Sequence, residues 1–248
     1  MGVTPHSEPT PFRTGAACCR RGYLARVSAP EPLPRSPSEI AEDELFYRRY
    51  GPWSAFDPPA LAAFMAGFTR PWWIVGGWSI DAFTGVAREH EDIDLSILNR
   101  DVPTLREHVG DRWHLWNVGD GTLRLLTQES PHVPDPESQI WAREHALAPW
   151  VLDLPITPDR DGLWTSKRLP DQVLPLEQAT WVAADGLRYV NPEIALHFKA
   201  RQHRPKDTRD LHLTLPLLDA RARAWLRDSI SRSEPADHPW LPLIDAVP

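Results

Sequence analysis

The stretch WWIVGGWSIDAFTGVAREHEDIDLSIL, residues 72–98, decides the fold of this chain. Its first four residues form an apolar run that enters the pair Gly76-Gly77, and apolar side chains then recur at helical spacing as far as the next glycine. Residues 92–98 alternate polar and apolar side chains, as a strand with one polar face does. The stretch therefore predicts the order strand, glycine turn, helix, strand.

Helix and strand patterns continue on both sides of this stretch. Residues 58–68 carry apolar side chains at helical spacing behind Asp57, a residue type that caps helices. Further along the chain we expect a helix over 102–109, a hairpin of 113–118 with 123–127, a short helix after the Pro-rich stretch 131–136, and strands over 150–157 and 180–183. Three further helices, which start at Pro192, Lys206 and Ala220, predict a small C-terminal helical lobe.

Proline usage indicates how the chain is divided. Residues 1–40 hold seven of the 27 Pro, with scattered Ser and Arg and no apolar periodicity, which is typical of a disordered extension. We therefore expect three parts: this extension, a core over residues 41–185 and the helical lobe over residues 186–248.

Composition excludes several classes of protein. A hydrophobic share of 42% in 248 residues suits a globular protein, and no run approaches the ~18 apolar residues of a membrane-spanning helix. The net charge of −7 lacks the basic excess of general nucleic-acid binders. Cys18 and Cys19 are adjacent and fit neither a zinc site nor a disulfide framework. The first forty residues lack the apolar core of a secretory signal, so we expect a cytoplasmic protein.

Acidic side chains give the first chemical signal. Asp92 and Asp94 stand two positions apart on the expected strand, so their side chains point to the same side. Such a pair can bridge divalent cations. Carboxylate oxygens suit Mg²⁺, and the phosphates of a substrate usually complete its coordination. Asp153, inside an otherwise apolar strand, would be the third carboxylate. The alternatives are a solvated strand face for the pair and an exposed edge-strand position for Asp153.

The glycine turn gives the second signal. A turn that opens a helix presents free backbone N–H groups at the positive end of the helix dipole, an arrangement that binds phosphate. A glycine pair alone usually marks only a turn, and a lone histidine such as His90 is more often structural than catalytic. The acidic pair begins fifteen residues beyond Gly77, and this order of elements favours a functional site over coincidence.

Together these residues resemble a known family. Gly76-Gly77-Trp78, Asp81, Gly85 and the run REHEDID at 88–94 are similar to the signature of the nucleotidyltransferase superfamily that includes DNA polymerase β. Within it the chain resembles aminoglycoside 2″-adenylyltransferases and lincosamide nucleotidyltransferases, in which Gly-Gly-Trp and Arg-x-His-x-Asp-x-Asp recur. The stretches YVNPEIALHFKA at 189–200 and 206–218 resemble the helical part of the same group. The resemblance covers residues 58–218.

This resemblance implies a fold, a reaction and a cofactor. The fold would be α/β (α+β), a mixed β-sheet nucleotidyltransferase core with flanking helices. The reaction would transfer a nucleoside monophosphate from an NTP to a hydroxyl of a small molecule and release pyrophosphate. The expected donor is ATP, so the transferred group would be AMP. Two Mg²⁺ ions would be held by Asp92 and Asp94, with Asp153 as metal ligand or as the general base.

The resemblance also implies which residues bind the nucleotide: Gly76, Gly77, Ser79, Arg88, His90 and Lys199. Arg88 and His90 could instead pair with neighbouring acids. Lys199 and Lys206 could neutralise the triphosphate or lie on a solvated helix face. Asp81 would orient the glycine turn, and no chemical role follows for Glu193 or Asp210. Aromatic side chains that could stack on a base or sugar are Trp78, Trp116 and Trp164, although most of the 12 Trp must lie in the core or at its rim.

Three functions stay open. The first is an enzyme that modifies a small molecule, an aminoglycoside-like antibiotic by resemblance. The second is a toxin-type nucleotidyltransferase whose acceptor is transfer RNA or a protein, and a basic groove within residues 201–221 would support the RNA version. The third is a degenerate relative that only binds nucleotide, although the presence of all three aspartates speaks against it.

Overall fold

The structure is a computed structural model and describes residues 37–119, 121–133 and 138–247. Its helices are α1 (Pro37–Tyr50), α2 (Pro58–Phe64), α3 (Gly76–Thr84), α4 (Val102–Val109), α5 (Leu176–Ala179), α6 (Pro192–Ala200), α7 (Pro205–Thr214), α8 (Ala220–Ser233) and α9 (Trp240–Asp245). Its strands are β1 (Trp72–Ile74), β2 (Leu95–Ile97), β3 (His114–Gly119), β4 (Thr122–Leu125), β5 (Gln139–Arg143), β6 (Leu152–Pro155), β7 (Asp159–Arg160), β8 (Leu163–Thr165), β9 (Val173–Leu174), β10 (Thr180–Val182) and β11 (Arg188–Val190). Short 3₁₀ turns cover Asn99–Asp101, Gly110–Arg112 and Leu215–Leu217.

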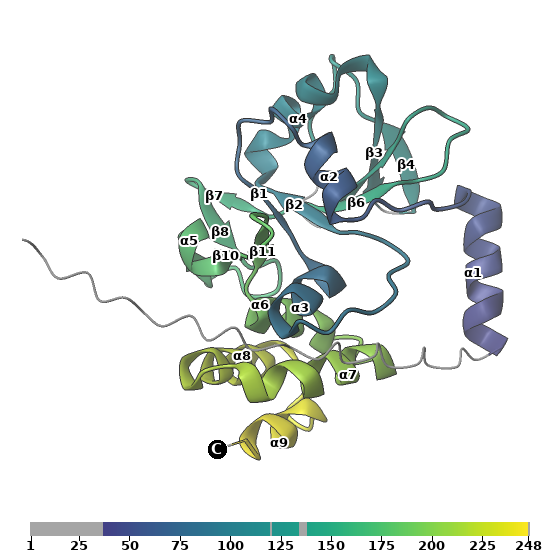
Figure 1. The fold of residues 1–248 in the computed structure, drawn as a ribbon. Helices are drawn as coiled ribbons and strands as arrows, with labels where there is room; N and C mark the ends of the chain where they lie inside the picture. Colours follow the sequence, from purple (N-terminus) through teal and green to yellow (C-terminus); the bar gives the residue numbers. More distant parts are fainter. Residues whose placement is uncertain (1–36, 120, 134–137, 248) are drawn as a thin grey trace, which may run out of the picture.

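Two four-stranded sheets meet at β2 and β6. Their strand orders are β10-β11-β1-β2 and β4-β3-β5-β6, and β1 pairs parallel to β11 but antiparallel to β2. Parallel bridges at Asp94–Asp153 and Leu98–Thr157 join β2 to β6, so the two sheets form one continuous surface. In Figure 1 the helices lie around this surface, with α2 and α4 at one end and α3 and α6 at the other. The expected mixed β-sheet with flanking helices is confirmed.

The sheet separates two hydrophobic cores. Ile74 packs with Leu95, Ile97 and the apolar side chains of β3, β5 and β6, whereas its neighbour Trp73 packs with Val190 and the helical lobe. Successive side chains of a strand point to opposite faces, so one short strand supplies both cores. The apolar run that opens the decisive stretch is therefore buried on both sides.

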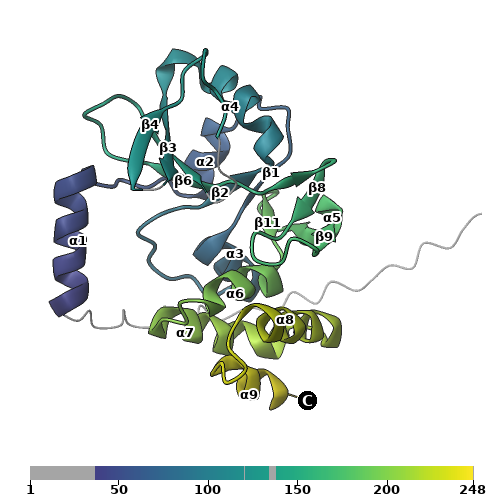
Figure 2. The same cartoon turned by 180° about the vertical axis from the view of Figure 1, so that it is seen from behind.

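The C-terminal helices α6 to α9 lie together beneath α3, as both views show (Figures 1 and 2). Helix α3 contacts α6 and α7, and α6 contacts α8. The expected start of this lobe at residue 186 stays a prediction as a domain boundary, but β11 lies beyond that residue and pairs with β1. The helices of the lobe thus follow directly from a strand of the central sheet.

Several sequence expectations are confirmed at the level of elements. Helix α4 covers the expected residues 102–109, and β3 and β4 form the expected hairpin. Asp57 caps α2, because its Oδ1 accepts a hydrogen bond of 2.8 Å from the backbone N–H of Ala60. Helix α2 ends at Phe64 rather than at residue 68.

The expectation of a disordered extension over residues 1–40 is wrong at its end. Residues 37–40 form the first turn of α1, while residues 1–36 lie outside the described residues. Phe46 and Tyr50, one helical turn apart, pack their rings against Trp141 on β5 at centroid distances of 5.7 and 5.6 Å. These long-range aromatic contacts hold a helix that its own weak apolar periodicity does not indicate.

Two further local expectations are wrong. The short helix expected after residue 136 is strand β5, which pairs with β3 on one side and β6 on the other. A short apolar run fits either structure, and pairing partners decide between them. The expected strand 92–98 begins only at Leu95, with Asp94 in a separate bridge. Residues 159–174, for which no strand is expected from the sequence, include the small sheet β7-β8-β9.

No helix among the described residues is long and apolar enough to cross a membrane.

Candidate active site

The glycine turn and Asp94 lie against each other. Helix α3 begins at Gly76, whose φ of +67° is a left-handed conformation that favours glycine. A β-carbon built on Gly76 would overlap Oδ2 of Asp94. The backbone N–H of Val75, just before the turn, donates a 2.9 Å hydrogen bond to the carbonyl oxygen of Asp94. The turn therefore fixes the backbone of Asp94 and leaves room for its carboxylate.

Asp94 and Asp153 are neighbours across the junction of the two sheets. They form a parallel bridge, and the backbone N–H of Asp153 donates to the carbonyl of Ile93 at 3.2 Å. Burial and the charge of Asp92 raise the pKa of Asp94 to about 7, although Lys199 acts in the opposite direction. Burial, together with the charges of Asp94 and Asp92, also raises the pKa of Asp153. The neighbouring negative charges and the burial thus make Asp94 and Asp153 weaker acids than solvated carboxyl groups.

Asp92 lies at the exposed edge of this group. It precedes the strand rather than lying within it, so strand alternation does not bring it to Asp94. The indole N–H of Trp78 donates to the carbonyl oxygen of Asp92 at 3.1 Å, which ties this residue to α3. The charge of Asp92 contributes to the raised pKa of both other aspartates, so Asp92 lies within electrostatic reach of them.

The donor set suits a hard divalent cation. Asp94 and Asp153 lie side by side, and Oδ1 of Asp153 is buried without a hydrogen-bond partner among the described residues, so it can ligate a cation or accept a proton. Within residues 37–119, 121–133 and 138–247, however, no three His, Cys, Asp or Glu side chains stand close enough to be a preformed metal cluster. Joint ligation by Asp92, Asp94 and Asp153 therefore stays a prediction.

The loop between α3 and Asp92 is anchored by Asp81. Its Oδ2 accepts the backbone N–H of Arg88 at 2.9 Å and lies 2.7 Å from Nε2 of His90. The His90 ring stacks on Trp78 at a centroid distance of 4.2 Å. A β-carbon on Gly77 would overlap both Arg88 and His90, so this loop packs directly on the glycine turn. Of the two alternatives for His90, the structure gives the pairing with an acid, and Asp81 orients the loop that covers the turn.

A buried ion-pair network joins this loop to the helical lobe. Asp210 of α7 lies 3.0 Å from Nζ of Lys199 and 3.6 Å from Nε of Arg88. Asp207 lies 3.4 Å from Lys199 and 2.8 Å from Arg204. Both aspartates are at most 1% exposed, and only 11% of the Lys199 side chain is exposed. Lys199 is therefore not on a solvated helix face, and two of the expected phosphate-binding cations are held together by Asp210.

Four further residues that the sequence singled out have these surroundings in the structure. Ser79 is fully buried and donates its hydroxyl to the carbonyl of Gly76 at 2.8 Å, so this hydroxyl stabilises the turn from inside. Lys206 is half-exposed, and its closest acidic partner is Glu91 at 3.9 Å. Trp78 stacks on His90, and Trp116 lies on β3 under the guanidinium of Arg143 at 4.8 Å.

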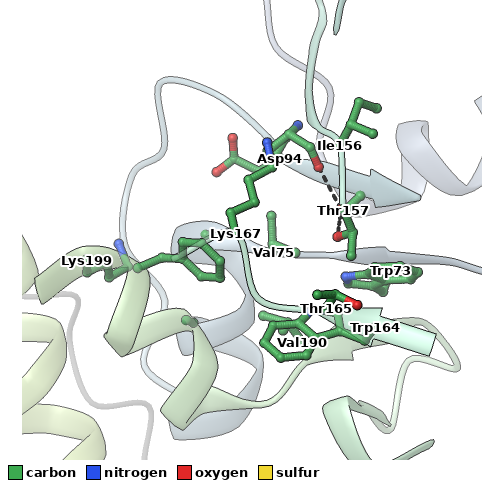
Figure 3. A pocket seen from close by; sticks show the side chains of 15 residues that line it. Trp73, Val75, Asp94, Ile156, Thr157, Trp164, Thr165, Lys167, Val190 and Lys199 are labelled. Carbon is green, nitrogen blue, oxygen red and sulfur yellow. Dashed lines mark hydrogen bonds between the residues drawn. The ribbon is translucent and has the colours of Figure 1, made fainter. Parts of the chain in front are cut away.

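A cavity of about 200 Å³ opens beside Asp94, between the sheet and α6. Figure 3 shows Asp94, Lys167 and Lys199 at one end of it and Trp73, Trp164 and Val190 at the other. Sequence reasoning singled out Asp94, Gly76, Lys199 and Trp164 but missed Trp73, Thr165 and Lys167. Trp73 has the pattern of an ordinary core residue, and the other two stand in a segment without a motif, so no sequence signal distinguishes them.

Comparisons with known proteins give one family and several structures. The model of the aminoglycoside-2″-adenylyltransferase family matches residues 60–112. Crystal structures of ANT(2″)-Ia in complex with adenylyl-2″-tobramycin and of lincosamide antibiotic adenylyltransferase LnuA with lincomycin are 19% and 20% identical to the chain, with TM-scores of 0.44 and 0.41. Each alignment covers 69% of this chain and 94% of the other.

A solution structure of the antibiotic-resistance factor ANT(2″)-Ia is 19% identical, with a TM-score of 0.42, over 69% of this chain and 88% of that one. No curated protein matches the sequence. The family match includes the glycine turn, the anchored loop, Asp92 and Asp94, and it ends before Asp153 and Lys199. The resemblance expected from the motifs is thus confirmed: residues 60–112 of this chain resemble the aminoglycoside-2″-adenylyltransferases.

Proposed function

We propose that the protein is an enzyme, a Mg²⁺-dependent nucleotidyltransferase that transfers a nucleoside monophosphate from an NTP to a hydroxyl of a small molecule and releases pyrophosphate. ATP is the donor in this proposal, AMP the transferred group and an aminoglycoside-like antibiotic the acceptor. One observation carries it: the β2–β6 junction brings Asp94 and Asp153 together beside the glycine turn. The match of residues 60–112 to an adenylyltransferase family supports it.

Asp153 is the general base in this proposal. The acceptor oxygen forms a bond to the α-phosphorus, the bond from that phosphorus to the pyrophosphate oxygen breaks, and the hydroxyl proton passes to Oδ1 of Asp153. This oxygen is buried and has no hydrogen-bond partner in the part of the chain that the structure describes, so it is able to receive a proton. Burial raises the pKa of Asp153, which makes its carboxylate more basic than a solvated one.

The remaining charges fit the two ends of the nucleotide. Mg²⁺ held by Asp92 and Asp94, with Asp153 beside them, would supply positive charge to the attacking and leaving oxygens. On the helical side, Lys199 and Arg88 face Asp210 close to the glycine turn, where they can balance the charge of the departing pyrophosphate. The backbone N–H groups at the start of α3 point at the same charge.

The acceptor in this proposal is cationic. The chain carries a net charge of −7, which attracts a polyamine such as an aminoglycoside over long range. We place the reaction in the cytoplasm, where the NTP is available.

Pyrophosphate release tests the proposal directly. The purified protein is incubated with Mg²⁺ and each of the four NTPs, against panels of aminoglycosides and lincosamides and against bulk tRNA, and products are weighed by mass spectrometry. We expect release with one small-molecule class and a product heavier by one nucleoside monophosphate. Chelation of Mg²⁺ and the variant Asp94→Asn are the two blanks.

The same assay separates the competing functions. Labelling of tRNA alone would identify nucleic acid as the acceptor. The exposed cations at the α6–α7 turn, Arg201, Arg204 and Lys206, would then be candidates to bind its phosphates. NTP binding without release on any panel would favour a protein acceptor. Absence of NTP binding would contradict nucleotidyl transfer altogether.

A further inference from the structure

The cavity beside Asp94 has two chemically different ends. Its mouth is lined by Gly76, Asp94, Lys167 and Lys199. All of these except Lys167 belong to the site described above. Its inner wall is apolar and largely aromatic, formed by Trp73, Trp164, Val190, Ala195 and Phe198. Two lysines at the mouth disfavour a cationic ligand, while the aromatic wall favours a flat one. A molecule that enters from the mouth thus has a negatively charged end near Lys199 and an apolar, planar end inside.

Two polar atoms of this wall lack a partner. The indole Nε1 of Trp73 and the hydroxyl Oγ1 of Thr165 are buried and make no hydrogen bond to any described residue; the two residues are 0% and 5% exposed. Buried polar groups in native proteins are nearly always paired, because an unpaired one loses its hydrogen bonds to water without replacement. Both residues line the cavity, so a ligand that occupies it can supply the missing partners.

The other hydroxyls of the wall are already paired. Ser96 donates to the carbonyl oxygen of Pro155 at 2.6 Å, and its Oγ lies 2.7 Å from Oγ1 of Thr157 (dashed in Figure 3). The unpaired atoms are therefore one obligatory donor, the indole N–H, and one hydroxyl that can donate or accept. This combination matches the polar edge of a heteroaromatic ring that carries an acceptor nitrogen or oxygen beside a second polar group.

We propose that this cavity binds the base of the nucleotide and that Trp73 and Thr165 contact its edge and determine which nucleotide is used. The inference rests on the proposed function and adds its specificity. With the base inside, its ribose and phosphates extend toward Asp94, Gly76 and Lys199 at the mouth. Trp164 and Phe198 supply faces against which the ring packs.

Thr165→Val gives the sharpest test, because it removes the hydroxyl and keeps the shape of the side chain. Thr157→Val is its matched control: it makes the same substitution in the same wall, but at a hydroxyl that Ser96 already engages. Binding of the imido analogues of the four NTPs is measured by calorimetry with Mg²⁺ present, so that no turnover interferes. Inorganic tripolyphosphate, which lacks a base, reports the phosphate end alone.

We expect the native protein to prefer one base, and Thr165→Val to reduce that preference about fivefold to tenfold, as the loss of one hydrogen bond does. Its affinity for tripolyphosphate and the preference of Thr157→Val should stay unchanged. Trp73→Phe, if it folds, should reduce the preference by a similar factor.

Other outcomes overturn the inference in distinguishable ways. Native protein that binds every analogue equally, or a Thr165→Val variant with unchanged preference, would contradict the role of these residues and leave nucleotidyl transfer standing. Equal loss of tripolyphosphate binding in Thr165→Val would mean a general distortion and also contradict it. Failure of the native protein to bind any analogue would remove the proposed function itself.

Discussion

The α-carbon of Gly76 faces the carboxylate of Asp94 so closely that a methyl group on it would overlap Oδ2. Gly76→Ala should therefore displace this carboxylate and reduce transfer by about 100-fold or more, as small misplacements of catalytic groups do. The measurement is kcat/KM for nucleotidyl transfer together with the melting temperature.

Gly85→Ala is the matched control for that variant. Gly85 has a similar φ of +70°, but no atom of the described residues lies within 4 Å of a new β-carbon on it. Both alanine variants should lose about 1 to 2 kcal/mol of stability through left-handed backbone strain, while only Gly76→Ala loses activity. Equal activities would show that the contact with Asp94 does not matter.

Asp94→Asn should abolish transfer without destabilising the fold. The pKa of Asp94 is raised from 3.8 to about 7, so the folded protein disfavours its charged form. The unfolded chain then loses this proton first, and native stability falls as pH rises from about 4 to about 7. Without metal, the variant should melt at the same or a higher temperature than the native protein at pH 8. A lower melting temperature at that pH would contradict the charge repulsion described for this site.

Asp210→Asn should weaken nucleotide binding. The change keeps the size of the side chain but removes the charge that holds Lys199 and Arg88, so we expect the KM for the NTP to rise about tenfold. The KM for the acceptor should not change, because the network lies on the nucleotide side.

Thr214→Val, one turn further along α7 and equally buried, controls for general loosening of this helix. If both variants raise the KM for the NTP by the same factor, Asp210 has only a structural role.

His197 should make the protein sensitive to acid. It is fully buried on α6 with Nε2 2.9 Å from the hydroxyl of Ser233, and burial together with Arg168 and Arg232 lowers its pKa from 6.5 to about 4. Between these two pH values His197 is protonated in the unfolded chain but neutral in the native state. The free energy of unfolding therefore falls on acidification by an amount on the order of 3 kcal/mol. Denaturant titrations at pH 7 and pH 4.5 measure the difference. His197→Gln should show a smaller loss over this range, and an unchanged loss would assign the sensitivity to other groups.

Elements with a strong local signal could be predicted from the sequence. Strand β1, the glycine turn and α3 follow from an apolar run, two glycines and helical spacing, and α4 and the β3–β4 hairpin follow from similar local patterns. Strand β5 could not be predicted, because the short segment Gln139–Arg143 fits a helix or a strand equally well. Its pairing with β3 and β6 determines that it is a strand. Helix α1 depends on rings that meet Trp141 about ninety residues away.

The sequence by itself determined the chemical types at the site, which are aspartates, a glycine turn and a lysine on a C-terminal helix, because local patterns show which residue types each element carries. Only the tertiary structure decided which of them meet. The parallel bridge places Asp153 beside Asp94. Asp210 forms ion pairs with both Arg88 and Lys199, and Asp81 pairs with His90. It also placed Trp73 and Thr165 around one cavity. Such contacts depend on how strands pair and helices pack, and these long-range choices leave no periodic trace in the amino-acid order.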